Sequence, residues 1–450
     1  MTRITEGDQN LSDQRLEWQH EQMVNAVVQR DSELYYHQVL STPCLNQIIH
    51  AEGPYIHTAS GQRLLDFHGN SVHQLGFAHP GVVHAIEQQM RTLPYCTRRY
   101  TNDRAVELAQ RLVSTAPGQL RDHARVLLTP SGSAAVGIAI KIARASTGRH
   151  KTVAFHDAFH GATLDAAAVS GQDLFHRGMG PMMPGVMHVP PPANPNCALC
   201  HDARCSDACA DQVERLLAEQ DIAAVIAEPI RATTVRTAPV SYWKRILESC
   251  DRTGTMLIFD EIPTGLGRSG KLWASEHTGV TPDLMVIGKG LGGGIFPQAA
   301  VIGRSDLNDT GPTPVRELAL GHYTHEKSPV GSAAALATID TIINEGLAQR
   351  SLELGQRWKA DYESALLATP GVLAVRQVGL MLAVELHYPD HADRAMYHAL
   401  RHGLSFKVGG ATTLVLFPPL NIEQNLLDEA TEILIKAVSE THQAVVKNFT

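Results

Sequence analysis

An acid and an amine in matching positions give the first indication of chemistry in this sequence. Asp260 follows an apolar run at 256–259, and Lys289 lies 29 residues later, just behind a second apolar run that ends at Ile287. Open α/β sheets place their sites at the carboxyl ends of such buried strands. An amine and a carboxylate delivered together suit pyridoxal phosphate, because the lysine forms a Schiff base with the aldehyde and the acid keeps the pyridine nitrogen protonated.

The elements that must position these two residues follow a regular pattern. Between about 100 and 340, helical stretches alternate with the short apolar runs RVLLTP, TVAFHD, AAVIAEP, MLIFDE and LMVIGKG. This alternation predicts an α/β fold in which helices wrap a mostly parallel sheet. The stretch at 79–93 has helical apolar spacing. From about 345 the pattern predicts a separate α/β lobe that ends in a helix over 426–446.

Composition and charge narrow the class of protein. The chain has 450 residues, is 44% hydrophobic and carries a formal net charge of −8. A net acidic protein is a poor match for nucleic acid, and no apolar run is long enough to span a membrane. The N-terminus is polar and has no apolar core for a secretory signal, and seven cysteines in a chain of this length do not indicate a disulfide scaffold. We therefore expect a cytoplasmic protein.

The sequence around Asp260 and Lys289 resembles the class III aminotransferase family. That family's pattern runs Asp-Glu-Val-Gln-x-Gly-x-Gly-Arg-x-Gly, then Pro-Asp, then Gly-Lys-Gly. The matching residues are Asp260, Glu261, Gly265, Gly267, Arg268, Gly270, Pro282, Asp283, Gly288, Lys289 and Gly290. The resemblance covers nearly the whole chain and implies the fold type I architecture of pyridoxal-phosphate enzymes. It also implies a large cofactor-binding domain at 76–344 and a small domain built from 1–75 and 345–450.

The resemblance implies further cofactor contacts. The turn before the helix at 129–144 would cup the phosphate, although a Ser-Gly-Ser sequence is also an ordinary helix cap. One aromatic residue and one aliphatic residue would cover the two faces of the pyridine ring. A threonine before an Ala-rich helix would reach the phosphate of the neighbouring subunit of a homodimer, although it too can be a simple cap. The implied residues are Gly132, Ser133, Phe159, His160, Glu228, Asp260, Ile262, Lys289 and Thr324.

Several positions depart from the family pattern. Ala134 and Gly137 stand where two glutamates are usual, Ala162 replaces an arginine, and Pro263 replaces the glutamine that normally bonds the phenolic oxygen of the cofactor. Two more departures concern the substrate. Val415 replaces the arginine that grips an α-carboxylate, and Thr233 replaces the glutamate that pairs with it. Losing both is self-consistent, because a buried arginine without its partner would be destabilising.

These two departures favour an eliminating lyase, which has only one half-reaction, over a glutamate-dependent aminotransferase. Within the family, the chain looks most similar to members that deaminate 1-hydroxy-2-aminoethylphosphonate to phosphonoacetaldehyde and ammonia. An ω-aminotransferase that uses pyruvate as acceptor, or a phospho-lyase for ethanolamine-type phosphates, remains an alternative.

A phosphonate or phosphate head group needs cations, and arginine suits its geometry. The sequence offers Arg98, Arg99, Arg231 and Lys407, each of which can equally be a solvated surface charge. His73 or His68 could protonate a leaving hydroxyl.

A cysteine-rich insert at 194–211 offers a possible structural metal site. Cys197, Cys200, Cys205 and Cys209 lie within 13 residues, but their spacing is not that of a standard zinc finger. Reduced thiols in a loop are the simpler interpretation. A non-catalytic metal-binding or regulatory protein built around this cluster is a third possible function, and the intact frame of Asp260 and Lys289 argues against it.

Overall fold

The chain folds into two compact units. The computed structural model describes residues 17–18, 25–38, 44–193 and 207–447. Unit 1 comprises Met1–His79, Thr233–Val235 and Leu347–Thr450, and unit 2 comprises Pro80–Ala232 and Arg236–Gly346. In the described part of the chain, no helix combines the length and apolar character needed to cross a membrane.

The α/β fold expected from the sequence is confirmed in unit 2, whose described residues form a seven-stranded sheet. Strand β12 runs antiparallel to both of its neighbours, and the remaining pairs are parallel. Each predicted apolar run contains one strand. In spatial order the strands are β4 (Ala124–Thr129), β12 (Ala299–Arg304), β11 (Leu284–Ile287), β10 (Met256–Asp260), β7 (Ile222–Ala227), β5 (Lys151–Phe155) and β6 (Val186–Val189).

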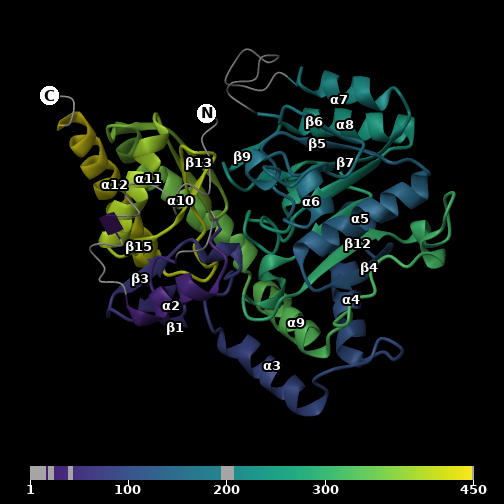
Figure 1. Cartoon of the computed structure of the whole chain (residues 1–450), viewed down its shortest axis with the longest axis horizontal. Helices are drawn as coiled ribbons and strands as arrows, with labels where there is room; N and C mark the ends of the chain where they lie inside the picture. Colours follow the sequence, from purple (N-terminus) through teal and green to yellow (C-terminus); the bar gives the residue numbers. More distant parts are fainter. Residues whose placement is uncertain (1–16, 19–24, 39–43, 194–206, 448–450) are drawn as a thin grey trace. The chain divides into compact units, whose positions relative to one another are not determined.

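Helices cover both faces of this sheet, which explains why its strands read as unbroken apolar runs. On one face, Ile226 and Ile258 pack with α5 (Gly132–Thr147) and α6 (Leu164–Val169). On the other, Val225 and Phe259 pack with α7 (Ala210–Leu217) and α8 (Val240–Thr253). Figure 1 shows α7 and α8 side by side, with strands between them and α5. The remaining elements of unit 2 are α3 (Pro80–Thr92), α4 (Asp103–Thr115), α9 (Pro329–Asn344) and the short hairpin β8 (Ile230–Arg231) and β9 (Arg236–Thr237).

Unit 1 contains two small sheets. The first has the order β1 (Ile48–Glu52), β2 (Tyr55–Thr58), β3 (Arg63–Asp66) and β15 (Leu404–Ser405), so it joins the two ends of the chain. The second has the order β13 (Val372–Val378), β14 (Met381–Leu386), β17 (Thr413–Leu416) and β16 (Lys407–Gly409). Its helices are α2 (Ala26–Leu34), α10 (Leu347–Ala368), α11 (Pro389–Arg401) and α12 (Gln424–Lys447).

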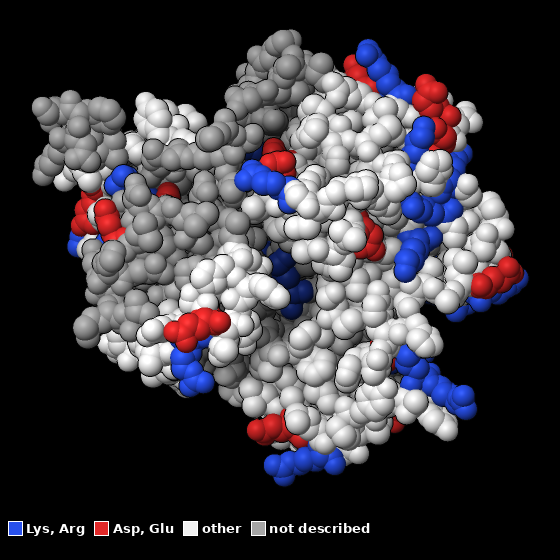
Figure 2. Space-filling view, viewed as in Figure 1, with Lys and Arg blue, Asp and Glu red and all other residues white. Residues whose placement is uncertain are grey.

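Figure 2 shows basic side chains with acidic ones next to many of them among the described residues on this face. A nucleic-acid-binding face needs a continuous basic surface. The mixed charges that are visible here fit the net negative charge of the chain.

Candidate active site

The predicted acid and amine leave adjacent parallel strands of unit 2. Asp260 is the last residue of β10 and is level with Val286 on β11. Lys289 lies three residues after Val286 and is the first residue of a short 3-10 helix (Lys289–Gly292). Its backbone φ is +46°, an uncommon value for a residue other than glycine. Both residues line one cavity of about 170 Å³.

The cavity gathers four separate segments of the chain at this edge of the sheet. They are the start of α5, the turn after β5, the turn after β10 and the turn after β11. The lining residues are Gly132, Ser133, Phe159, His160, Gly161, Asp260, Ile262, Pro263 and Lys289. Seven of the nine cofactor residues implied by the resemblance are therefore brought together.

A hydrogen-bond network fixes the Asp260 carboxylate. His160 Nδ1 donates to Asp260 Oδ2 over 2.7 Å, and the Ile262 backbone N–H donates to Oδ1 over 2.9 Å. The two side chains of the first pair are 0% and 2% exposed. Ser170 Oγ in turn accepts the backbone N–H of His160 over 2.9 Å. Ser170 was not predicted from the sequence, because its partner lies ten residues earlier, before the start of α6.

The start of α5 offers an anion site. Ser131 Oγ caps the helix by accepting the N–H of Ala134, so the N–H groups of Gly132 and Ser133 are left at the helix terminus. Ser133 Oγ accepts the N–H of Ala162 over 3.2 Å, and its own proton stays available to a ligand. Since a helix N-terminus attracts negative charge, this turn suits a phosphate.

Close packing shapes the turn further. A Cβ on Gly132 would lie 2.7 Å from Ile262 Cδ1, and one on Gly161 would lie 2.3 Å from Ser133 Oγ. Gly161 also has a backbone φ of +133°, which side-chain-bearing residues rarely adopt. Both glycines are therefore required for the cavity wall to keep this shape.

These features fit pyridoxal phosphate. The buried His160 Nε2 makes no hydrogen bond among the described residues, so Nδ1 carries the ring proton that Asp260 needs. The α5 turn would hold the phosphate, Asp260 the pyridine nitrogen and Lys289 the aldehyde carbon. When bound, the cofactor supplies an aldehyde that captures amines and a ring that withdraws electrons from the attached carbon.

One departure from the family pattern has a structural counterpart. A Cβ on Gly137 would lie 2.1 Å from Asp165 Oδ2. Where the family pattern has a glutamate at position 137 of α5, this chain has glycine, and the carboxylate of Asp165 from α6 occupies the space beside it. Gly137 was the signal in the sequence, but the identity of Asp165 was not predictable from it.

Glu261, next to Asp260, has a structural role. Its carboxylate accepts the backbone N–H groups of Ala274 (2.5 Å) and Ser275 (2.8 Å), so it caps the short helix Ala274–His277. Burial raises its pKa to about 7, although the two hydrogen bonds act in the opposite direction.

Two implied cofactor residues lie outside the cavity lining. Glu228 lines a neighbouring, smaller cavity together with Arg231, and its Oε2 accepts the N–H of Ala232. Arg231 donates to the carbonyl of His156 over 3.0 Å and lies 3.8 Å from Asp157 Oδ2. Thr324 is exposed in the segment before α9.

The other predicted substrate residues have varied surroundings. Arg98 and Arg99 are both exposed, and Arg98 pairs with Glu326. In unit 1, His73 is buried and its Nε2 bonds the carbonyl of Asp66, and His68 Nδ1 accepts the N–H of Asn70. Lys407 begins β16 in the same unit.

The cysteine prediction falls mostly outside the described residues, since Cys197, Cys200 and Cys205 lie there. Cys209 is buried, 2% exposed, in the apolar core beside α7 and α8. No group of three or more metal-ligating side chains occurs within the described ranges.

Taken together, the parallel sheet, the lysine and carboxylate at its edge, and the anion-binding turn define a fold type I pyridoxal-phosphate enzyme. Comparison with known proteins agrees. The family model described as Aminotransferase class-III matches residues 36–438, and the chain belongs to this family.

Named relatives include enzymes with different reactions. The chain is 39% identical to the (R)-1-hydroxy-2-aminoethylphosphonate ammonia-lyase of Vibrio splendidus, over 97% of this chain and 95% of the relative. It is 31% identical to an acetylornithine aminotransferase of Caldanaerobacter subterraneus, over 87% and 94% of the two chains. Among solved structures, the PLP-bound amine transaminase of an uncultivated Pseudomonas species is 28% identical, with a TM-score of 0.81. The match covers 91% of this chain and 98% of the transaminase.

Proposed function

We propose that this enzyme is an ammonia-lyase that converts 1-hydroxy-2-aminoethylphosphonate to phosphonoacetaldehyde and ammonia. The observation that carries the proposal is the loss of charge at positions 233 and 415, where an amino-acid aminotransferase needs a glutamate and an arginine. The similarity to the Vibrio splendidus lyase along nearly the full length of both chains supports the same reaction.

The two neutral positions belong to the same small sheet region of unit 1. Val415 is buried on β17, opposite Lys407 of β16. A Cβ on Gly409, two residues along β16, would lie 2.0 Å from the Thr233 carbonyl oxygen, so the Thr233 backbone rests directly on this strand. Neither position supplies a charge that could bind or balance an α-carboxylate, so glutamate would be a poor amino donor.

A nearby arginine does not replace the missing one. Arg376 forms an ion pair with Glu385, and its Nε donates to the Thr234 carbonyl over 2.8 Å. The side chains of this ion pair are only 16% and 14% exposed. Breaking a pair that is this buried would leave an uncompensated charge, so Arg376 is committed to structure.

The reaction needs no second substrate. Lys289 Nζ takes a proton from the carbon that bears nitrogen, and a proton is delivered to the hydroxyl on the neighbouring carbon so that it leaves as water. That neighbouring carbon then regains a proton. A water molecule then replaces the amine nitrogen, which gives one aldehyde and one ammonia per substrate. Asp260, held by His160, would keep the pyridine nitrogen of the bound cofactor protonated, so that the ring can accept electrons.

The phosphonate needs a cation, and Arg99 is our choice. Among the described residues Arg99 has no ion-pair partner, in contrast to Arg98 and Arg231. Tyr95, in the same connection between α3 and α4, donates from its hydroxyl to the Thr324 carbonyl over 3.3 Å. In the homodimer that we propose, Arg99 and Thr324 would enter the site of the neighbouring subunit together.

The test is incubation of purified enzyme with each enantiomer of the amino-phosphonate and no keto acid. We expect ammonia and phosphonoacetaldehyde in equal amounts from one enantiomer, and no product with Lys289→Ala. Turnover that requires pyruvate would overturn the proposal and favour an ω-aminotransferase. Release of inorganic phosphate from ethanolamine phosphate, with no reaction of the phosphonate, would favour a phospho-lyase.

A further inference from the structure

The segment that carries Thr324 has a strained backbone at both ends. His322 has a φ of +84° and Lys327 a φ of +58°. Residues with a side chain seldom adopt such values, and they persist only where surrounding contacts hold them. Contacts from elsewhere in unit 2 hold residues 322–327, here called the Thr324 loop.

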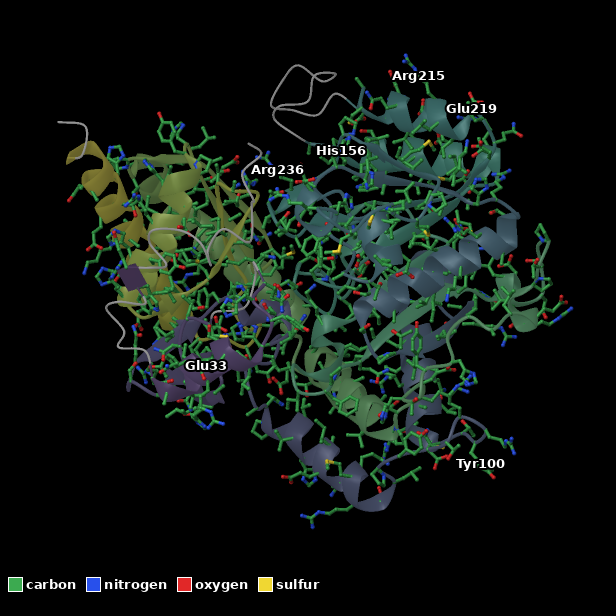
Figure 3. The ribbon with its side chains drawn as sticks, in the orientation of Figure 1. Glu33, Tyr100, His156, Arg215, Glu219 and Arg236 are labelled. Carbon is green, nitrogen blue, oxygen red and sulfur yellow. The ribbon has the colours of Figure 1, made fainter. Side chains whose placement is uncertain are left out.

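The connection between α3 and α4 holds the loop at its centre and at its end. Besides the bond from Tyr95 to Thr324, the Tyr95 ring packs edge-on against His325, with centroids 5.5 Å apart. Asn102 Nδ2 donates to the Lys327 carbonyl over 3.0 Å. Figure 3 labels Tyr100 in this connection, where its side chain projects outward from unit 2.

Arg98 contacts two further side chains of the loop, Glu326 and His322. Its Nε donates to Glu326 Oε2 over 3.2 Å, and its Nη1 contacts His322 Nδ1. The Arg98 and Glu326 side chains are 33% and 18% exposed, so solvent screens the pair only in part. A guanidinium engaged by two groups of its own chain is poorly placed to bind a substrate as well.

We propose that Arg98 is a positioning residue: it locks the Thr324 loop through Glu326 and His322, and so sets the affinity of a neighbouring copy of the chain for the cofactor phosphate. The inference rests on the shared site of the proposed function. It changes the role expected for Arg98 from substrate binding to presentation of Thr324, and it leaves Arg99 as the cation for the substrate.

The test compares two adjacent arginines by equilibrium dialysis of the holoenzyme at a series of pyridoxal phosphate concentrations, with bound cofactor read from its visible absorbance. Arg98→Gln should weaken cofactor binding about 2- to 5-fold, the effect of losing one partly exposed ion pair. At saturating cofactor its KM for the amino-phosphonate should match that of the wild type. Arg99→Gln should leave the cofactor affinity unchanged and raise the KM for the amino-phosphonate. Arg104→Gln, which removes only an exposed pair with Glu107, is the matched control.

Two further variants separate positioning from a general loss of structure. Thr324→Val should weaken cofactor binding as Arg98→Gln does, and the double variant should be no worse than either. The charge swap Arg98→Glu with Glu326→Arg should recover most of the affinity. Should Arg98→Gln not fold, Glu326→Gln takes its place in the dialysis.

Unchanged cofactor affinity in Arg98→Gln, or a raised KM with that affinity intact, would overturn the proposed positioning role of Arg98. Additive losses in the double variant with Thr324→Val would overturn it too. The dialysis uses no substrate, so a failure of the ammonia-lyase reaction leaves this result readable, and failure of the lock leaves the lyase assay unaffected.

Discussion

The bond between His160 and Asp260 gives the sharpest prediction about the site. Two substitutions separate the bond from the imidazole itself. His160→Leu fills similar space but has no donor. His160→Asn places an amide nitrogen where Nδ1 stands, so it can still donate to Asp260.

The expected size of the effect follows from the geometry. The bond is 2.7 Å long, its acceptor is a carboxylate, and both side chains are at most 2% exposed. A hydrogen bond to a charged group contributes about 1.5–3 kcal/mol. About 1.4 kcal/mol corresponds to a factor of ten. His160→Leu should therefore lower cofactor affinity and kcat/KM, taken together, by roughly 10- to 150-fold.

The loss should be found in two separate measurements. Equilibrium dialysis gives the cofactor affinity, and kcat/KM at saturating cofactor gives the remaining effect on the reaction. We expect His160→Leu to have both a lower cofactor affinity and a lower kcat/KM. His160→Asn should stay within about fivefold of the wild type in both quantities. Equal losses in the two variants, or wild-type behaviour of His160→Leu, would refute the assignment of this bond.

Three further predictions concern packing and pH. Gly137→Ala should lower the free energy of unfolding by about 1–2 kcal/mol, because the new methyl group overlaps Asp165 Oδ2. In an Asp165→Ala background it should raise that energy by about 1 kcal/mol through helix propensity, and the same sign in both backgrounds would contradict the contact. Gly161→Ala should weaken cofactor binding about tenfold or more by displacing Ser133, as measured by dialysis, and unaltered affinity would argue against the anion site. Burial raises the pKa of Glu261 from 4.5 to about 7, so the stability contributed by its protonated form is present below pH 4.5 and is lost as pH rises through about 7. Relative to Glu261→Gln, the wild type should therefore lose Tm between pH 5 and 8, and a constant difference would exclude this cause.

Much of the fold was accessible from the sequence. Strands β4, β5, β7, β10 and β11 each overlap a predicted apolar run, because strands that are covered on both faces are rich in apolar residues. The antiparallel direction of β12 was not predicted. An apolar run looks the same in either direction, and only the path of its connections decides how it pairs.

The candidate site was also predictable only in part from the sequence. Asp260 and Lys289 were evident because each sits at the end of its own strand, and the strand order then brings them to one edge. Arg98 was expected to bind substrate, whereas its guanidinium contacts a loop 224–228 residues later in the chain. A surface cation and a structural one have the same appearance in a sequence.

The sequence by itself indicated the cofactor chemistry and the neutral residues Thr233 and Val415, since both depend only on which residue type stands at a position of the family pattern. Tertiary structure alone decided which side chains from distant segments come into contact: His160 with Asp260, Asp165 with Gly137, and Arg98 with Glu326. Sequence patterns report the local periodicity of one element. Contacts between distant segments depend on how the loops close, and that is fixed only when the whole unit packs.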